Sequence, residues 1–244
     1  LGFTALSDPF VLRPLNTAGG AITNDTAWTA GWSPYVVTQD VVIANGATLT
    51  LQPSVTARFR PGRSLRVYDG TLVARGSAQS NIVFTADLSP PADAGNRWAC
   101  IVFEDNARDA VLTADGSWSA GSVLEHAVIE YGGNTNVSGA VRVDNAVPLV
   151  RKCIVRFNAQ SGIGGAYAPG LRLVDNVISN NTAGGIRLAH AAGLRLEGNT
   201  VCTNSADLDG AGIYCFNCPG SIAVGNTVSR NQGSQGGSSG GGAF

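Results

Sequence analysis

The feature that most constrains this chain is a repeat in its second half, with a period of about 23 residues. Four similar nine-residue blocks, each ending in asparagine, finish at Asn158, Asn181, Asn204 and Asn231. The first three asparagines are evenly spaced by one period, and the last interval is longer because it carries the insertion ADLDG. A repeat this short cannot bury an apolar face alone, so it must stack on its neighbours. The repeat therefore predicts a solenoid with one coil per repeat.

Each repeat holds short alternating strands that place matching side chains in columns along the solenoid axis. Parallel coils stack about 4.8 Å apart, so residues one period apart lie above one another. An inward aliphatic column is predicted at Val155, Ile178, Val201 and Val228. Two positions earlier lie Cys153 in the first block and Asn176, Asn199 and Asn226 in the other three. We interpret these asparagines as a structural ladder of amides that bond from coil to coil.

The first half of the chain has longer alternating strands, in residues 35–59 and 62–85, that predict the opening coils of the same stack. The chain is therefore expected to be all-β, a parallel β-helix of roughly eight coils with a period of about 23–27 residues. We expect the β-helix at residues 32–232 and a Gly/Ser-rich C-terminal tail at residues 233–244. The N-terminal segment 1–31 is expected to act as a cap or as an intersubunit strand.

These stretches resemble bacterial exported proteins with right-handed parallel β-helix repeats, often called pectate-lyase-like. The resemblance spans roughly residues 32–232 and includes the segments GTLVARGSAQSNIVFTAD, RWACIVFED and SVLEHAVIEYGG. It implies a right-handed coil and an exported protein. It leaves the activity open, because the same coils serve in adhesins, surface-layer parts, phage spikes and polysaccharide-cleaving enzymes.

Charge and composition argue against two classes of partner. The formal net charge is −1 and Lys152 is the only lysine, so no basic stripe is available to neutralise a nucleic-acid backbone. No run approaches the roughly 20 apolar residues that cross a bilayer, so no membrane span is expected. The chain does not begin with Met. We expect an extracellular or cell-surface protein whose leader has been removed, and no cofactor.

The sequence offers one group of residues suited to catalysis or ligand binding. The chain does not match, residue by residue, the basic residue and calcium-binding carboxylates of pectate lyases. It does not match the aspartate trio of polygalacturonases either. The same intervals that separate the repeated asparagines place Asp144, Tyr167, His190 and Asn217 in one column. An acid, a ring and an imidazole stacked in this way are able to hold a sugar or transfer a proton. The alternative is an exposed column of turn residues, and His126 is interpreted as a structural bend residue.

Two short motifs have structural alternatives as well. Asp207 and Asp209 begin a calcium-loop pattern, but the remaining ligands are missing, which favours a solvated loop. Cys215 and Cys218 form a CxxC pair without the strand and helix of a thioredoxin site. Core packing or one local disulfide is the preferred interpretation of that pair.

The ends of the chain suggest contacts with other copies. The apolar residues that we assign to self-assembly are Leu1, Phe3, Leu6, Phe10, Val11 and Phe244. An uncapped solenoid end is a template for pairing with another chain. The leading prediction is a non-catalytic extracellular or cell-surface structural protein that assembles through its termini into a fibre or layer. The alternative is a β-helix that binds or cleaves polysaccharide.

Overall fold

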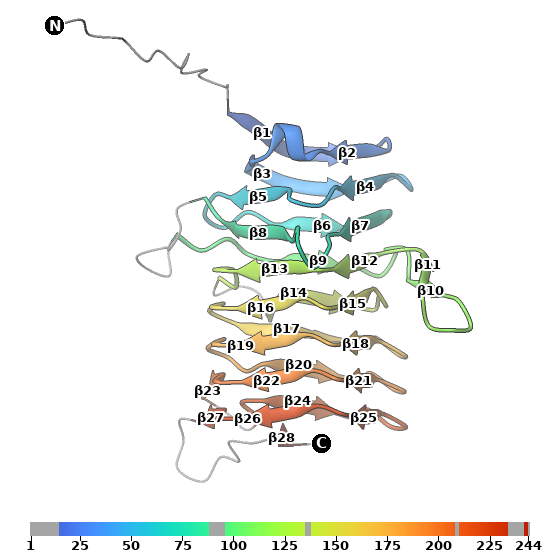
Figure 1. Ribbon diagram of the computed structural model, residues 1–244, viewed down its shortest axis with the longest axis vertical. Coiled ribbons are helices and arrows are strands. Elements are labelled where there is room, and N and C mark those ends of the chain that lie inside the picture. The colour runs from blue at the N-terminus through green and yellow to red at the C-terminus, as the bar shows by residue number, and fades with distance from the viewer. Residues whose placement is uncertain (1–14, 88–95, 135–137, 208–209, 234–241, 244) are drawn as a thin grey trace, which may run out of the picture.

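The chain winds into a parallel β-solenoid of about nine turns (Figure 1). This computed structural model describes residues 15–87, 96–134, 138–207, 210–233 and 242–243. Within those ranges there is no α-helix, and the short 3-10 helix η1 covers Ala30–Trp32. The structure confirms the predicted all-β solenoid.

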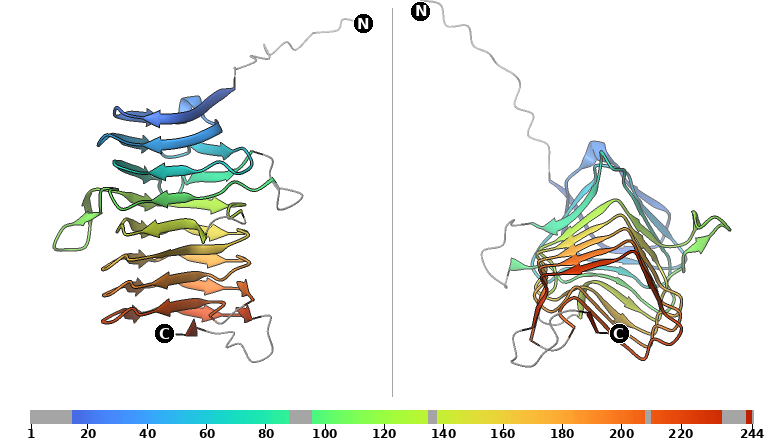
Figure 2. Two further views of the ribbon diagram at one scale, coloured as in Figure 1. Left: turned by 180° about the vertical axis from the view of Figure 1, so that it is seen from behind. Right: turned by 60° about the horizontal axis from the view of Figure 1, so that its bottom comes forward.

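Three faces make up each coil, as the view toward the end of the stack shows (Figure 2). The first face contains β3 (Tyr35–Ile43), β5 (Thr56–Phe59), β8 (Ile82–Ala86), β13 (Ala127–Glu130), β16 (Ile154–Arg156), β19 (Val177–Ser179), β22 (Thr200–Cys202) and β26 (Thr227–Ser229). The second face contains the end of β3, then β6 (Leu65–Val67), β9 (Ile101–Phe103), β14 (Gly139–Asp144), β17 (Ser161–Ala166), β20 (Ile186–Ala189), β24 (Ile213–Phe216) and β28 (Gly242–Ala243).

The third face is a sheet of eight strands. Its members are β2 (Thr26–Trp28), β4 (Thr48–Leu51), β7 (Thr71–Arg75), β12 (Val123–Glu125), β15 (Leu149–Arg151), β18 (Arg172–Val174), β21 (Arg195–Glu197) and β25 (Ile222–Val224). Two small pairs complete the strands, the projecting hairpin of β10 (Val111–Leu112) with β11 (Trp118–Ala120), and β23 (Ser205–Ala206) with β27 (Gln232–Gly233).

The solenoid begins ahead of residue 32, where the sequence analysis placed its start. Strand β1 (Asn16–Ile22) pairs in parallel with β3, and β2 pairs with β4, so part of the segment 1–31 forms a coil of its own. The side chains of β1 alternate between half-buried and exposed. At the other end, β28 pairs with β24 and lies within the segment 233–244.

The core follows the predicted columns. Val155, Ile178 and Val201 lie in register and are fully buried, whereas Val228 in the last coil is 37% exposed. Their neighbours on the same strands face outward, as Thr200 does. Stacking thus buries each aliphatic side chain between the coils above and below it.

Corners of the coils turn at single residues in the left-handed backbone region. Between the second and third faces these residues are Asn145, Tyr167, His190 and Asn217, with φ angles of 53°, 56°, 53° and 53°. His126, with a φ of 48°, occupies such a bend between the third and first faces. A side chain costs about 1–2 kcal/mol in this conformation, which neighbouring coils must offset.

Asparagines line the inside of two corners as ladders. The amide Nδ2 of Asn176 donates to Oδ1 of Asn199, and that of Asn199 donates to Oδ1 of Asn226, both at 2.9 Å. A second ladder, used in the sequence analysis only to define the repeat, consists of Asn158, Asn181, Asn204 and Asn231. Each amide also donates to a backbone carbonyl, so these buried polar groups are satisfied.

Candidate ligand-binding groove

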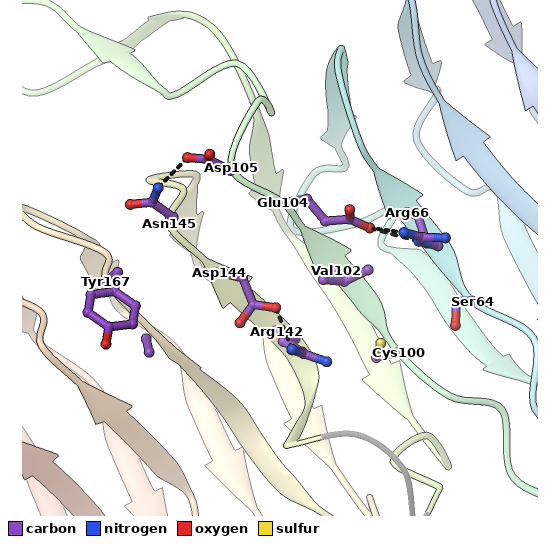
Figure 3. Close-up of a pocket in the computed structure, with 11 residues that line it drawn as sticks. Ser64, Arg66, Cys100, Val102, Glu104, Asp105, Arg142, Asp144, Asn145 and Tyr167 are labelled. Carbon is purple, nitrogen blue, oxygen red and sulfur yellow. Dashed lines mark hydrogen bonds and ion pairs between the residues drawn. The ribbon is translucent and has the colours of Figure 1, made fainter.

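An open groove of about 710 Å³ lies on the outer side of the second face (Figure 3). Its walls come from β6, β9 and β14, with Arg66, Glu104, Arg142 and Asp144 prominent among them. A second hollow of about 360 Å³ shares Arg142 and Asp144 and adds Arg187 and Tyr214. The two hollows therefore run together along the axis of the solenoid.

The floor of the groove is open because its outward positions carry small residues. Strand register aligns Arg142 with Gly164 and then with Arg187, and it aligns Asp144 with Ala166 and then with Ala189. A methyl group at Gly164 would collide with the carbonyl oxygen of Ser138. Glycine is thus required by the close approach of the Ser138 backbone, which covers it. The small side chain of Ala166, which lines both hollows, is what leaves the floor open.

The charged side chains of the groove are paired within it. Arg66 Nη2 lies 2.7 Å from Glu104 Oε1, and Arg142 Nη2 lies 2.6 Å from Asp144 Oδ2. The hydrogen bond with Glu104 raises the pKa of Arg66 above its usual value. The guanidinium of Arg187 lies over the ring of Tyr214, 4.4 Å from its centroid. With Asp105 included, three arginines and three carboxylates line the two hollows, which therefore offer hydrogen-bond donors and acceptors without a net charge.

An aromatic rim borders the groove at the corner that follows the second face. The rings of Tyr167 and His190 stack with centroids 4.9 Å apart and planes 6° from parallel. Phe216 meets His190 edge-on at 5.7 Å, and Asn217 Nδ2 lies 2.9 Å from His190 Nδ1. Tyr167 and Phe216 are 59% and 55% exposed. We call Tyr167, His190, Phe216 and Asn217 the rim.

The structure corrects the position of Asp144 in the column proposed from the sequence. Asp144 pairs in register with Ala166, so it lies one position before the column of Tyr167, His190 and Asn217. Asn145 occupies the column instead and donates a hydrogen bond to Asp105. The error arose because Val141 pairs with Ile163, an interval one residue shorter than the repeat. The sequence analysis also missed Phe216, whose exposed ring precedes the corner.

Two buried thiols, one of them in the groove, are poorly suited to act as nucleophiles. Burial raises the pKa of Cys100, on the floor of the groove, to about 11. Burial likewise raises the pKa of Cys153, which hydrogen-bonds through its backbone N–H to the first ladder, to about 12. Few molecules carry a thiolate at either position near neutral pH.

Only some residues of the other candidate sites lie within the described ranges. Asp207 is exposed, and Asp209 lies outside the described residues. Within the described part of the chain, no group of three histidine, cysteine or acidic side chains is arranged to hold a metal ion. The proposed self-assembly residues Leu1, Phe3, Leu6, Phe10, Val11 and Phe244 all lie outside the described residues. Among the described residues, no helix is long and apolar enough to cross a bilayer.

Comparisons with known proteins agree with this architecture. The model of a family described as a right-handed β-helix region matches residues 128–243. The chain folds as a right-handed parallel β-helix. This β-helix is also similar to Protein bark beetle of Drosophila melanogaster, with 38% identity over 65 residues, which are 27% of the chain and 2% of the fly protein. The chain thus spans a very small part of that relative. No solved structure matches the chain.

Proposed function

We propose that this β-helix binds a polysaccharide strand in the groove of its second face and does not cleave it. The observation that carries the proposal is the continuous run of paired polar groups along a floor of small residues, bordered by exposed rings. Coils lie about 4.8 Å apart, and an arginine recurs on every second coil at Arg66, Arg142 and Arg187, which suits a polymer that also repeats. Such a ligand is consistent with the extracellular or cell-surface location expected from the sequence.

The side chains of the groove match the chemistry of sugars. Guanidinium and carboxylate groups such as those of Arg142 and Asp144 donate to and accept from hydroxyl groups. The exposed ring of Tyr167 offers an apolar surface with a polar hydroxyl, and such rings are common anchors at binding sites. A ligand that lies across the floor at Ala166 meets all three residues within neighbouring coils.

The same geometry favours binding over hydrolysis. A pair of carboxyl groups, or a carboxyl group and a base, must flank the bond that a glycosidase breaks. The carboxylate of Asp144 is engaged by Arg142 and lies outside the column of His190. His190 in turn is held between Tyr167, Phe216 and Asn217.

A panel of neutral and acidic polysaccharides tests the proposal by affinity electrophoresis and calorimetry. Tyr167→Ala is expected to weaken binding about tenfold, equivalent to about 1.4 kcal/mol. Tyr131→Ala is the matched control, because Tyr131 also occupies a left-handed corner position and stacks on Phe157, but at a different corner. Assays for new reducing ends and unsaturated products are expected to detect no cleavage. Absence of binding across the panel, or equal losses in both variants, would contradict the groove as the site.

A further inference from the structure

Two cysteines bracket half of the rim. Phe216 and Asn217 are the two residues between Cys215 and Cys218, and both contact the ring of His190. Any bond between the two sulfur atoms would therefore close a loop that contains only these two rim residues. The position of the pair links its chemistry directly to the geometry of the rim.

The two thiols lie together on the inner side of the corner. Cys215 pairs in register with Leu188, and the sulfur of Cys218 lies 4.0 Å from the carbonyl oxygen of the same Leu188. Both side chains are half-buried and pack against the same core cluster. Burial, together with a hydrogen bond between the two thiols, raises the pKa of Cys215 to about 12.

The remaining cysteines occupy separate places. Cys100 lies on the groove floor, Cys153 lies inside the corner that carries the first ladder, and Cys202 ends β22 on the first face. All five are free thiols in the structure. Cys215 and Cys218 are thus the pair placed for an intramolecular bond.

We propose that Cys215 and Cys218 form a disulfide that fixes Phe216 and Asn217 against His190. Its formation is independent of the ligand, whereas its effect on ligand affinity rests on the proposed function. A disulfide across four residues removes conformational freedom from the segment that must order when a ligand binds. The oxidised form is therefore the form with the prearranged rim.

The oxidant is a small disulfide such as oxidised glutathione. The thiolate of Cys218 attacks one of its sulfur atoms, forms a mixed disulfide and releases one molecule of reduced glutathione. Cys215 then loses its proton and attacks the sulfur of Cys218, which expels the second reduced glutathione. The protein loses two protons and two electrons, and one glutathione disulfide becomes two thiols. Because Cys215 has a raised pKa, the second step is expected to quicken as the pH rises.

The first test is chemical and needs no ligand. The full chain is incubated with oxidised glutathione, then digested without reduction and mapped by mass spectrometry. A cross-linked peptide containing Cys215 and Cys218 is expected, and Cys202→Ser should leave it unchanged. Free thiols at both positions, or stable glutathione adducts without closure, would overturn the proposal.

The second test follows the rim itself. The chain has two histidines, so the imidazole NMR signals of His190 are assigned by their loss in His190→Gln. Oxidation is expected to shift and sharpen these signals in the native chain but not in Cys215→Ser or Cys218→Ser. Unchanged His190 signals in a chain that carries the disulfide would show that the bond does not fix the rim.

Ligand affinity separates failure of this inference from failure of the proposed function. Oxidised protein is expected to bind the polysaccharide up to about tenfold more tightly than reduced protein. Equal binding by both forms, with loss in Tyr167→Ala, would refute the effect of the disulfide and leave the groove as the binding site. A cross-link with shifted His190 signals but no polysaccharide binding would refute the proposed function and keep the disulfide.

Discussion

The coils before β13 and those from β13 onward differ in the side chains that fill their interior. In the earlier coils, large aromatic residues fill the interior, with Phe59 stacked on Trp98 at 4.4 Å and near Phe84 at 6.5 Å. In the later coils, aliphatic columns run between two asparagine ladders. The family model matches residues 128–243, which is nearly the same later part.

Coil length differs between the two parts for a physical reason. In the later coils, an amide must meet the amide one coil away, so Asn176, Asn199 and their partners keep nearly constant intervals. In the earlier coils, Leu65 pairs with Ile101 and Val73 pairs with Val123, with long excursions between them. Aromatic packing tolerates such insertions because it places no demand on the length of the corner. The ladders therefore favour even coils in the later part, although the opening strands keep the same interval without a ladder, as between Thr26 and Leu49.

The largest effect is expected from a charge placed in the regular core. Val201→Asp buries a carboxylate with no partner between two coils, at a cost of several kcal/mol, and should abolish the cooperative unfolding transition seen by circular dichroism. Thr200→Asp is the control, because Thr200 lies on the same strand and faces outward. Similar melting curves for the two variants would show that the inward register is wrong.

A smaller loss is expected from an interruption of the first ladder. Asn199 accepts hydrogen bonds from the backbone N–H and Nδ2 of Asn176, and it donates to the Leu173 carbonyl and to Asn226. Asn199→Ala leaves these buried groups without partners, so we expect a loss of about 2–4 kcal/mol in the free energy of unfolding. Urea denaturation measures it.

The control for the ladder is Asn226→Ala at its last position. Asn226 is only half-buried, and water is able to replace its bonds, so a smaller loss is expected there. Equal losses at Asn199 and Asn226 would show that the ladder is not a coupled element. A loss at Asn199 below that at Asn226 would show that the buried positions of the ladder do not stabilise the regular coils.

The sequence was sufficient to predict the regular coils because their signal is periodic. The column of Val155, Ile178 and Val201, and the ladder of Asn176, Asn199 and Asn226, follow from one repeated interval. The repeated interval did not predict the groove, since the walls of the groove on β6 and β9 come from coils with irregular intervals. Asp144 was misplaced for the same reason, because a single interval one residue shorter changes the column to which a side chain belongs.

The smallest effect is expected at the junction of the two parts, where Glu125 on β12 bridges Arg75 and Arg151. Both arginines lie 2.7 Å from the carboxylate, and they come from the coils on either side of it. Burial opposes ionisation, but the hydrogen bond from Arg75 and the charge of Arg151 outweigh it and hold the pKa of Glu125 below its usual value.

Because the folded pKa of Glu125 is lowered, its stabilisation is present at neutral pH and is lost as the pH falls below about 4.3 and through the folded value. Glu125→Gln is therefore expected to lower the free energy of unfolding by about 1 kcal/mol at pH 7, with the difference from the native chain shrinking toward pH 3. Urea denaturation at several pH values measures this. Glu197→Gln is the control, since Glu197 pairs with Arg172 within the regular coils and its side chain is 28% exposed compared with 9% for Glu125. A difference between Glu125→Gln and the native chain that stays constant from pH 7 to pH 3 would show that the ion pair does not couple the aromatic coils to the regular ones.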